Sequence, residues 1–173
     1  MQSEIATVID ATSLANLVNA AYRGAGGRYG WTHEAALIGG DRISSTDVAA
    51  TIGDGSTAVL VRRGDKSSAP LGCVAIEMYS ANRCTISMLA VAPELQAAGL
   101  GGALLADAEQ FAASKGATIA KITVVQQREA LIAWYERRGY RRTGALEGFP
   151  YDDDSVGTPL RDDLVFVILE KVL

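Results

Sequence analysis

Three glycines close together mark the part of this sequence that is best suited to chemistry. Gly99, Gly101 and Gly102 follow an apolar segment that ends at Pro93, and they open an amphipathic run over residues 102–115 that predicts a helix. The first N–H groups of a helix have no intrahelical partner and carry the positive end of its dipole. Because no Ser, Thr, Asp or Asn caps this helix, the pattern favours a bound phosphate there. A bare turn with glycine as its own N-cap is the alternative.

Two well-known phosphate-binding loops do not fit this segment. The dinucleotide fingerprint G-x-G-x-x-G would place its last glycine at Leu104, which is bulky. The P-loop needs Lys and then Ser or Thr after its last glycine, whereas Ala103 follows Gly102 here. A phosphate bound at this segment would therefore be held by a loop of another kind.

Two motifs at a fitting separation resemble the GNAT superfamily of N-acetyltransferases. The run 96–101 matches that family's acetyl-CoA loop, Gln/Arg-x-x-Gly-x-Gly/Ala, and residues 91–93 stand where the preceding strand should end with Val-x-Pro. The run 130–140 resembles its next motif, Ala-x-x-x-(aromatic)-Tyr-x-x-x-Gly-(Phe/Tyr), and one helix and one strand separate the two motifs. The resemblance implies acetyl-CoA as cosubstrate and direct acetyl transfer to an amine within a ternary complex.

The resemblance also implies which residues hold the coenzyme. They belong to the strand before the loop and to the loop itself: Leu89, Ala90, Val91, Gln96, Ala97, Ala98, Gly99, Leu100, Gly101 and Gly102. The N–H of Leu89 or Ala90 would polarise the thioester carbonyl, although the side chains of Leu89 and Val91 also suit a core strand. Many family members carry Asn where this chain has Arg128, which either reaches a coenzyme phosphate or lies in solvent.

Tyr135 is the leading catalytic candidate. A phenol near pKa 10 stays protonated at neutral pH and can donate to a departing thiolate, and in the family a Tyr at this place lies beside the coenzyme sulfur. The alternative is a Tyr packed on the sheet with its hydroxyl at the surface.

The general base is a separate question. Thr123 stands where some members place a Glu base and cannot serve. Glu77 is the leading base instead, because a charge after three apolar residues is out of place in a core; a solvent-facing strand end is its alternative. Glu34 is the second choice of base.

The acceptor is expected to be a small-molecule amine rather than a peptide or protein. Trp31 and Glu34 lie in the loop between the first two predicted helices and would form an aromatic and acidic pocket for a cationic amine. Tyr151 lies in the second loop that faces the acceptor in this fold, next to the acidic run 152–154, which also reads as a solvated turn. Because the family's Asn and Glu are both missing, a non-catalytic acyl-CoA-binding sensor or interaction module is the alternative function.

Composition sets further limits on function. The chain has 173 residues and a net charge of −4, so residues 1–173 are expected to form a single domain that binds no nucleic acid. No apolar run approaches the roughly 18 residues of a membrane span, and the first residues lack the basic and hydrophobic regions of a signal peptide. The two cysteines have no metal-ligand spacing, so no metal is expected. These features predict a cytoplasmic protein, and a homodimer is left open.

Periodicity and turn residues predict a mixed α+β domain with a mostly antiparallel, twisted sheet flanked by helices, in the order βααβββαβαββ. Asp10 or Thr12 is expected to cap the first helix, and Ser44 or Ser45 the second. The expected strands are 5–9, 57–62, 71–79, 84–91, 118–125, 140–145 and 164–170, and the expected helices are 14–22, 44–52, 102–115 and 128–138.

Overall fold

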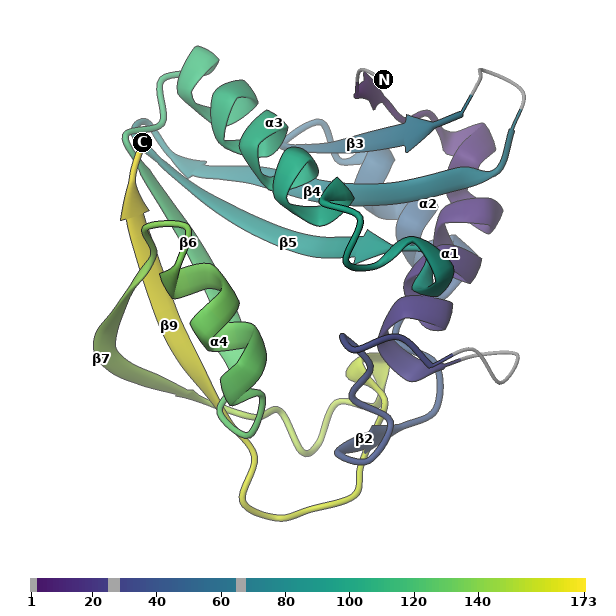
Figure 1. Ribbon diagram of the computed structural model, residues 1–173, viewed down its shortest axis with the longest axis vertical. Coiled ribbons are helices and arrows are strands. Elements are labelled where there is room, and N and C mark those ends of the chain that lie inside the picture. The colour runs from purple at the N-terminus through teal and green to yellow at the C-terminus, as the bar shows by residue number, and fades with distance from the viewer. Residues whose placement is uncertain (1–2, 25–28, 65–67) are drawn as a thin grey trace.

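A computed structural model describes residues 3–24, 29–64 and 68–173. Four helices and a seven-stranded sheet form one layered unit, with a small two-stranded sheet at one end (Figure 1). The helices are α1 (Ala11–Arg23), α2 (Ser45–Gly53), α3 (Leu100–Ser114) and α4 (Glu129–Glu136). The strands are β1 (Glu4–Ile5), β2 (Ile38–Gly39), β3 (Thr57–Arg63), β4 (Pro70–Ser80), β5 (Arg83–Val91), β6 (Ile119–Val125), β7 (Arg141–Gly148), β8 (Thr158–Pro159) and β9 (Val165–Val172).

The main sheet has the strand order β1-β3-β4-β5-β6-β9-β7, and every neighbouring pair except β5 and β6 is antiparallel. The parallel pairing of β5 with β6 covers only residues 83–85 and 119–121. Beyond it the two strands diverge and the sheet opens into a V, with β3 to β5 on one arm and β6, β9 and β7 on the other (Figure 1). Backbone groups on the facing edges of β5 and β6 therefore have no neighbouring strand within this opening.

Strand β5 carries a bulge inside the opening. Ser87 pairs with Ala75 and Ala90 with Cys73, so two residues of β5 face the single residue Val74 of β4. Met88, one of those two, has a φ of 51°, a conformation that L residues rarely adopt. A bulge locally re-aims the strand. Here it turns the backbone around Leu89 at the point where β5 leaves β6.

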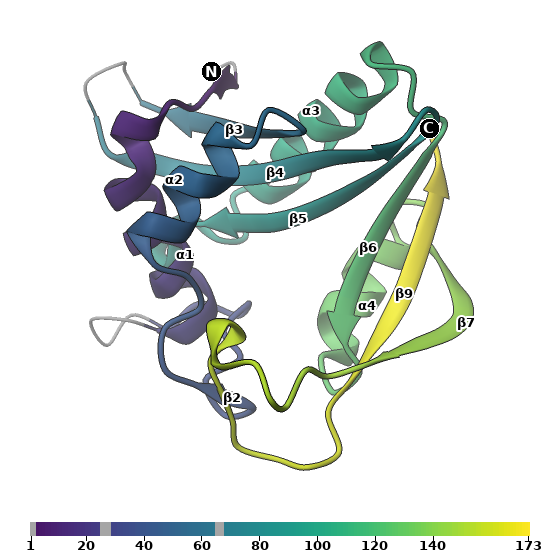
Figure 2. The same cartoon turned by 180° about the vertical axis from the view of Figure 1, so that it is seen from behind.

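The helices cover both faces of one arm of the sheet and one face of the other. Helices α1 and α2 pack on one face of the β3–β5 arm, as seen from behind in Figure 2, and α3 packs on the opposite face of that arm. Helix α4 lies against the other arm, on the same side of the sheet as α3 (Figure 1). One apolar cluster, which includes Leu104 and Ile132, fills the α3 and α4 side. A second, which includes Leu14 and Val48, fills the α1 and α2 side.

The fold class and the order of the main elements are confirmed. The predicted cap of α2 is also confirmed, because the Ser44 hydroxyl accepts a hydrogen bond of 3.1 Å from the Asp47 N–H.

The first strand is shorter than the predicted 5–9. The Thr7 N–H donates to the Asp10 carboxylate at 2.8 Å and a 3₁₀ turn forms at Val8–Asp10 instead. Asp10 is therefore engaged before α1 begins and its side chain does not cap that helix.

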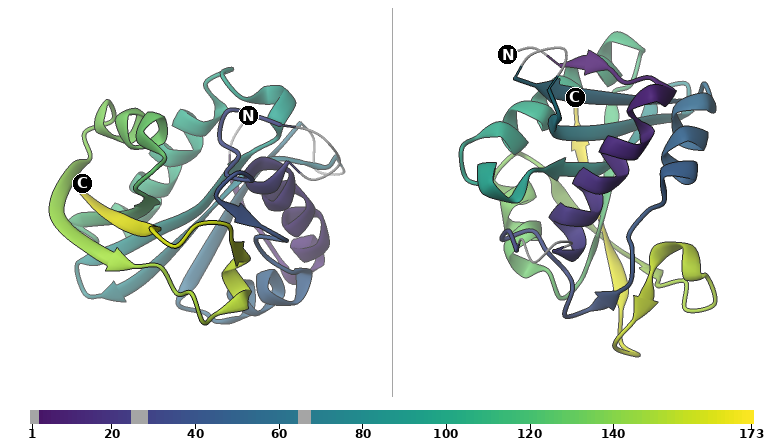
Figure 3. Two further views of the ribbon diagram at one scale, coloured as in Figure 1. Left: turned by 90° about the horizontal axis from the view of Figure 1, so that it is seen from below. Right: turned by 90° about the vertical axis from the view of Figure 1, so that its right-hand side faces the viewer.

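The loop after β7 contains structure that periodicity did not reveal. Strand β8 pairs with β2, which joins residues 158–159 to residues 38–39 across most of the chain length (Figure 3). The predicted turn at 64–70 and the irregular segment at 23–41 lie partly outside the described residues. Across the described residues, no helix combines the length and apolar character that a membrane crossing requires.

Candidate active site

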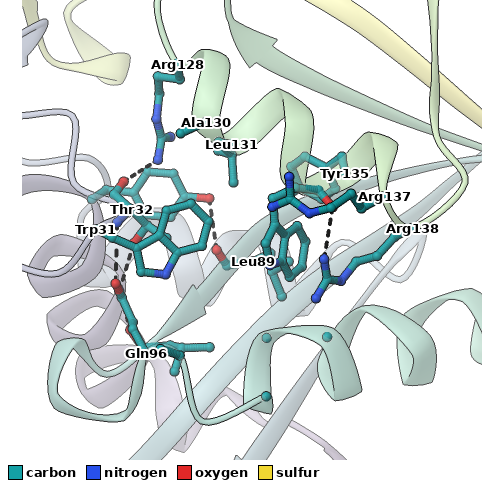
Figure 4. A pocket seen from close by; sticks show the side chains of 17 residues that line it. Trp31, Thr32, Leu89, Gln96, Arg128, Ala130, Leu131, Tyr135, Arg137 and Arg138 are labelled. Carbon is teal, nitrogen blue, oxygen red and sulfur yellow. Dashed lines mark hydrogen bonds between the residues drawn. The ribbon is translucent and has the colours of Figure 1, made fainter.

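An open cleft of about 400 Å³ lies between α3, α4 and the diverging end of β5 (Figure 4). Most of the predicted coenzyme residues line it: Leu89, Val91, Gln96, Ala97, Gly99, Gly101, Gly102 and Arg128. Trp31 and Tyr135 line it as well, whereas Ala90, Ala98 and Leu100 do not. The tertiary structure thus gathers the two sequence motifs and one distant loop around a single cleft.

The glycine loop presents free backbone donors to this cleft. Ala97 and Gly99 have φ values of 72° and 84°, so the chain turns tightly before α3 begins at Leu100. No side chain caps this helix. The Ala103 N–H donates to the carbonyl of Gly99, the residue just before the helix, and the N–H groups that precede Ala103 in the helix have no such partner among the described residues. The N–H groups of the first turn are available to an anion, as helix N-termini commonly are.

A cation that sequence reasoning missed lies at the same helix end. The Arg138 guanidinium is 3.3 Å from the point where a side chain on Gly102 would begin. It stacks 3.6 Å from the Trp134 ring centroid and donates to the Trp134 carbonyl at 3.0 Å. A cation at a helix N-terminus is electrostatically unfavourable by itself, so an anion bound between Arg138 and α3 would be stabilised by both. The second motif contains Arg138, but its pattern leaves that position unspecified.

Gln96 does not point its side chain toward the glycine loop's free donors. Its amide nitrogen donates to the Thr32 hydroxyl at 2.8 Å and to the Val91 carbonyl at 3.1 Å. Its amide oxygen accepts from the Thr32 N–H at 3.4 Å, as the dashed lines in Figure 4 show. Gly30 lies so close to this amide that any side chain there would collide with it. Gln96 therefore holds the loop before β2 against the cofactor loop.

Leu89 lies where the sheet opens, and its carbonyl accepts a hydrogen bond of 3.1 Å from the Tyr22 hydroxyl. Ala90 faces Cys73 across the β4–β5 ladder, and two residues further on the Ala92 N–H donates to the Leu71 carbonyl at 2.9 Å, toward β4. Because the backbone groups of consecutive strand residues point to opposite sides, the Leu89 N–H is the one directed away from β4. Of the two predicted oxyanion donors, Leu89 has the suitable position.

Tyr135 lies between the cleft and the core. Its side chain is almost fully buried, and its ring packs edge-to-face on Trp134 at 5.0 Å and on Tyr140 at 5.6 Å. Burial raises the pKa of its phenol above the usual value. Among the described residues no hydrogen bond to its hydroxyl is formed, so the group is protonated and available to a ligand in the cleft.

A second, smaller cavity of about 140 Å³ lies on the other side of the same opening. It shares Tyr22, Leu89, Arg128, Leu131 and Tyr135 with the first cleft. Its further walls come from β5, β6 and the loops before and after the small sheet, and include Ser87, Thr123, Glu34, Arg42 and Phe149. We call it the acceptor cavity, because it meets the first cleft at Leu89 and Tyr135.

The expectation of an acidic pocket at Trp31 and Glu34 has to be revised. Glu34 lines the acceptor cavity, but its side chain is only 6% exposed and both carboxylate oxygens bond arginines. One oxygen pairs with Arg23 and the other with Arg128 at 3.0 Å. A buried carboxylate that is fully paired in this way is not free to bind an ammonium group.

The two alternatives for Arg128 are also revised. Its side chain is 10% exposed, and besides Glu34 it bonds the Thr32 carbonyl. Figure 4 shows Arg128 and Arg138 at opposite ends of the cleft, with Arg138 over α3. Arg128 thus lies neither in solvent nor beside the glycine loop, and it fastens the loop that carries Trp31 and Glu34.

Three other predicted residues have different surroundings. Trp31 is 46% exposed at the rim of the cleft, 6.4 Å from the Trp134 ring. Tyr151 lines neither cavity; it packs on Phe149 and its hydroxyl accepts from the Leu164 N–H at 2.7 Å. Glu77 is exposed near the end of β4, opposite Thr57 and Thr85, and lines neither cavity. Its position is that of a solvent-facing strand end.

Within the described ranges, no group of His, Cys, Asp and Glu is arranged to hold a metal ion.

Comparison with known proteins agrees with this geometry. Among solved structures, nourseothricin acetyltransferase is similar at 28% identity and a TM-score of 0.57, over 69% of this chain and 66% of that chain, just under two thirds of that relative. The structure of yncA from Salmonella typhimurium with its cofactor acetyl-CoA matches at 20% identity and a TM-score of 0.71, over 100% and 94% of the two chains. The paia N-acetyltransferase of Thermoplasma acidophilum in complex with coenzyme A matches at 19% identity and a TM-score of 0.69, over 100% of both chains.

No curated protein matches this sequence. The model of the Acetyltransferase (GNAT) family, however, matches residues 29–140, which include both sequence motifs and the loop that closes the cleft. The chain belongs to the GNAT family of acetyltransferases.

Proposed function

We propose that this protein is an acetyl-CoA-dependent N-acetyltransferase that transfers the acetyl group directly to the amine of a small molecule. The observation that carries the proposal is the meeting of two cavities at Leu89 and Tyr135, in the opening between β5 and β6. A thioester that reaches this point from the cofactor cleft would be exposed to an amine from the acceptor cavity. Direct transfer needs this geometry, because it brings both reactants together.

The cofactor cleft has suitable groups for the two ends of coenzyme A. The free N–H groups at the start of α3 and the Arg138 guanidinium suit the pyrophosphate. The backbone edge of β5 from Leu89 to Val91 suits the amides of the pantetheine arm, because it has no strand partner on that side. The Leu89 and Val91 carbonyls already accept from Tyr22 and Gln96, so the N–H groups are the free part of this edge. The relatives solved with acetyl-CoA or coenzyme A support this assignment.

The chemistry follows from the groups at the junction. The amine nitrogen attacks the thioester carbonyl, and the Leu89 N–H stabilises the oxyanion that develops on the carbonyl oxygen. The carbon–sulfur bond then breaks, and the Tyr135 phenol donates its proton to the leaving thiolate. Burial raises the pKa of this phenol, but the same apolar surroundings raise the pKa of a thiol. Burial raises both pKa values, so it does not by itself oppose proton transfer from the phenol to the thiolate.

The amine must lose a proton, and no unpaired carboxylate lines the described part of the acceptor cavity. Ser87 on β5 and Thr123 on β6 are exposed residues that line this cavity, so it is open to water between the two strands. We assign proton removal to water at this open end. Glu77 is not part of the proposal, because it lines neither cavity.

Two measurements test the proposal. Calorimetric titration with acetyl-CoA is expected to give a micromolar dissociation constant, or about −8 kcal/mol. Thiol release from acetyl-CoA is then followed with a panel of amines that includes amino acids, polyamines and aminoglycosides. Turnover above background hydrolysis with any amine supports the enzyme. Tight binding without turnover on any amine would favour the acyl-CoA-binding module, and no binding of any acyl-CoA would exclude both.

A cytoplasmic location and a homodimer are part of the same proposal. Both cysteines are unpaired and buried, which suits a reducing compartment. Sedimentation of the purified chain at several concentrations tests the dimer.

A further inference from the structure

The acceptor cavity carries an excess of positive charge. Among the described residues that line it, Arg42 and Arg128 are cationic and Glu34 is the single carboxylate. Arg23, just behind the cavity wall, adds a third guanidinium group because it pairs with the same carboxylate. The chain as a whole has a net charge of −4, so this surplus is a local feature of the site.

The ion pairs account for only part of this charge. Glu34 is shared by Arg23 and Arg128. Both arginines also use carbonyl acceptors, Arg23 those of Gly40 and Val156 and Arg128 that of Thr32. These two side chains hold the loops around the cavity. One carboxylate cannot neutralise the charges of both arginines.

Arg42 has no such partner. Its guanidinium forms no ion pair or side-chain hydrogen bond within the described ranges, although the residue is half-buried and lines the cavity. Its guanidinium carbon lies 5.8 Å from the centroid of the Tyr22 ring, and that of Arg128 lies 5.7 Å from the same centroid. Burial lowers the pKa of Arg23, and charge repulsion from Arg42 and Arg128 adds to this effect. A half-buried guanidinium with unused donors beside other cations is arranged to receive an anion.

We propose that the acetylated amine also carries an anionic oxygen group, a carboxylate or a phosphoryl group, and that Arg42 binds this group. The inference rests on the proposed function and specifies its acceptor. It replaces the acidic pocket expected at Trp31 and Glu34, because Glu34 is already neutralised. Arg42 is a specificity-determining residue, and its planar guanidinium matches both oxygen groups with two parallel hydrogen bonds.

Tyr22 connects this charge to the reacting centre. Its ring lies beside Arg42, and its hydroxyl bonds the carbonyl of Leu89, whose N–H is the proposed oxyanion donor. The anionic group and the amine would therefore lie on either side of a single tyrosine side chain. Together with the cavity volume of about 140 Å³, this favours a compact acceptor with the two groups few bonds apart, as in an amino acid or an aminoalkylphosphonate.

The test compares acceptors that differ only in charge. Initial rates are measured with α-amino acids and with their α-carboxamides, which keep the amine and the shape but lose the negative charge. Aminoalkylphosphonates form a third arm that separates a carboxylate from a phosphoryl group, and aliphatic diamines form a cationic arm. Loss of a charge-assisted, two-bond contact is expected to lower kcat/KM by about 10- to 100-fold from acid to amide.

Variants of Arg42 provide the second comparison. Arg42→Gln is expected to lower kcat/KM for the anionic acceptor by about 10- to 100-fold, mainly through KM, and to change the rate with the carboxamide by less than about threefold. Arg42→Lys, which keeps the charge and loses the planar fork, should recover part of the loss. Arg83→Gln is the control, because Arg83 pairs with Glu170 at the closed end of β5 and β6. Acetyl-CoA affinity should be unchanged in all three.

Two results would overturn the inference while leaving the proposed function intact. One is a preference for diamines or carboxamides over the anionic amines. The other is an equal loss with charged and uncharged acceptors in Arg42→Gln. If no amine is acetylated, the proposed function fails, and calorimetry with N-acetyl amino acids in the presence of coenzyme A decides the inference separately. Binding that Arg42→Gln weakens would support the anion site, and no binding would exclude it.

Discussion

The side chain of Gln96 in the cofactor loop is bonded to Thr32, a residue 64 positions earlier in the chain. The amide nitrogen donates to the Thr32 hydroxyl and the amide oxygen accepts from the Thr32 N–H. This pair closes the loop that carries Trp31 over one end of the cleft and couples it to the strand end at Val91. The glutamine of the motif therefore positions a loop, rather than presenting its side chain to the coenzyme phosphates.

A double-mutant cycle measures this coupling. Gln96→Ala and Thr32→Val each remove one partner, and the two changes should be less costly together than the sum of the single effects, by about 1 kcal/mol in the free energy of unfolding. Urea denaturation of the four proteins gives the value. The Thr32 hydroxyl also donates to the Ala21 carbonyl. Both variants that carry Thr32→Val lose this hydrogen bond, so its contribution cancels in the cycle. Strict additivity would show that the pair contributes no coupling.

Gly101→Glu should abolish acetyl-CoA binding, by more than about 100-fold, and leave the fold intact. A side chain at this position would begin 3.6 Å from Val91 and 3.7 Å from Trp134, which is ordinary contact. An acidic residue in the first turn of a helix is also favourable for its dipole. The carboxylate would, however, occupy the proposed pyrophosphate site and repel it.

The matched control for this prediction is Ala106→Glu, which adds the same charge to an exposed position of the same helix. Calorimetry with acetyl-CoA and thermal unfolding are measured for both variants. Unchanged affinity in Gly101→Glu would show that the phosphates bind elsewhere.

Tyr135→Phe should lower kcat by about ten- to a thousand-fold with acetyl-CoA affinity nearly unchanged. A phenol that donates to a departing thiolate acts mainly in the transition state, where the sulfur becomes charged. The ring contacts with Trp134 and Tyr140 do not need the hydroxyl. The control is Tyr140→Phe, because Tyr140 is buried and lines neither cavity. Wild-type turnover in Tyr135→Phe, under conditions where chemistry limits the rate, would make Tyr135 structural.

The stability of the protein should fall above pH 9 in a way that depends on Cys73. Burial raises the pKa of this thiol from 9.0 to about 12. Between these values the unfolded chain loses the thiol proton while the folded chain keeps it, so the unfolded state is favoured as pH rises. From pH 8 to pH 10 the wild type should lose about 1 kcal/mol more than Cys73→Ala. Urea denaturation at the two pH values gives this difference. Equal losses would show that the thiol is ionised at its ordinary pKa in the folded protein.

Local patterns were sufficient for the four helices, for most strands of the main sheet and for the turn that opens α3. Strands such as β3 and β5 consist largely of apolar and β-branched residues, and α3 has a continuous apolar stripe, so periodicity alone located them. The capping of α2 by Ser44 and the turn before α3 depend on neighbouring residues only, as shown by the bonds of Ser44 to Asp47 and by the positive φ of Gly99. Interactions this short in sequence are encoded by residue type and spacing.

The tertiary structure alone decided what the polar residues of the site do. Glu34 and Arg128 are 94 positions apart, and their pairing turned an expected acidic pocket into a cavity with surplus positive charge. Arg138 was placed at the start of α3, and Arg42 beside Tyr22, by the packing of α4 and α1 on opposite faces of the sheet. A charged side chain is long and can bond many partners, so its sequence neighbours do not determine which partner it meets. The sequence determines where a strand or helix forms, because the hydrogen bonds and apolar contacts of these elements repeat with a short period. The charge of the site depends instead on segments far apart in the chain, which approach one another only once the sheet has folded and opened between β5 and β6.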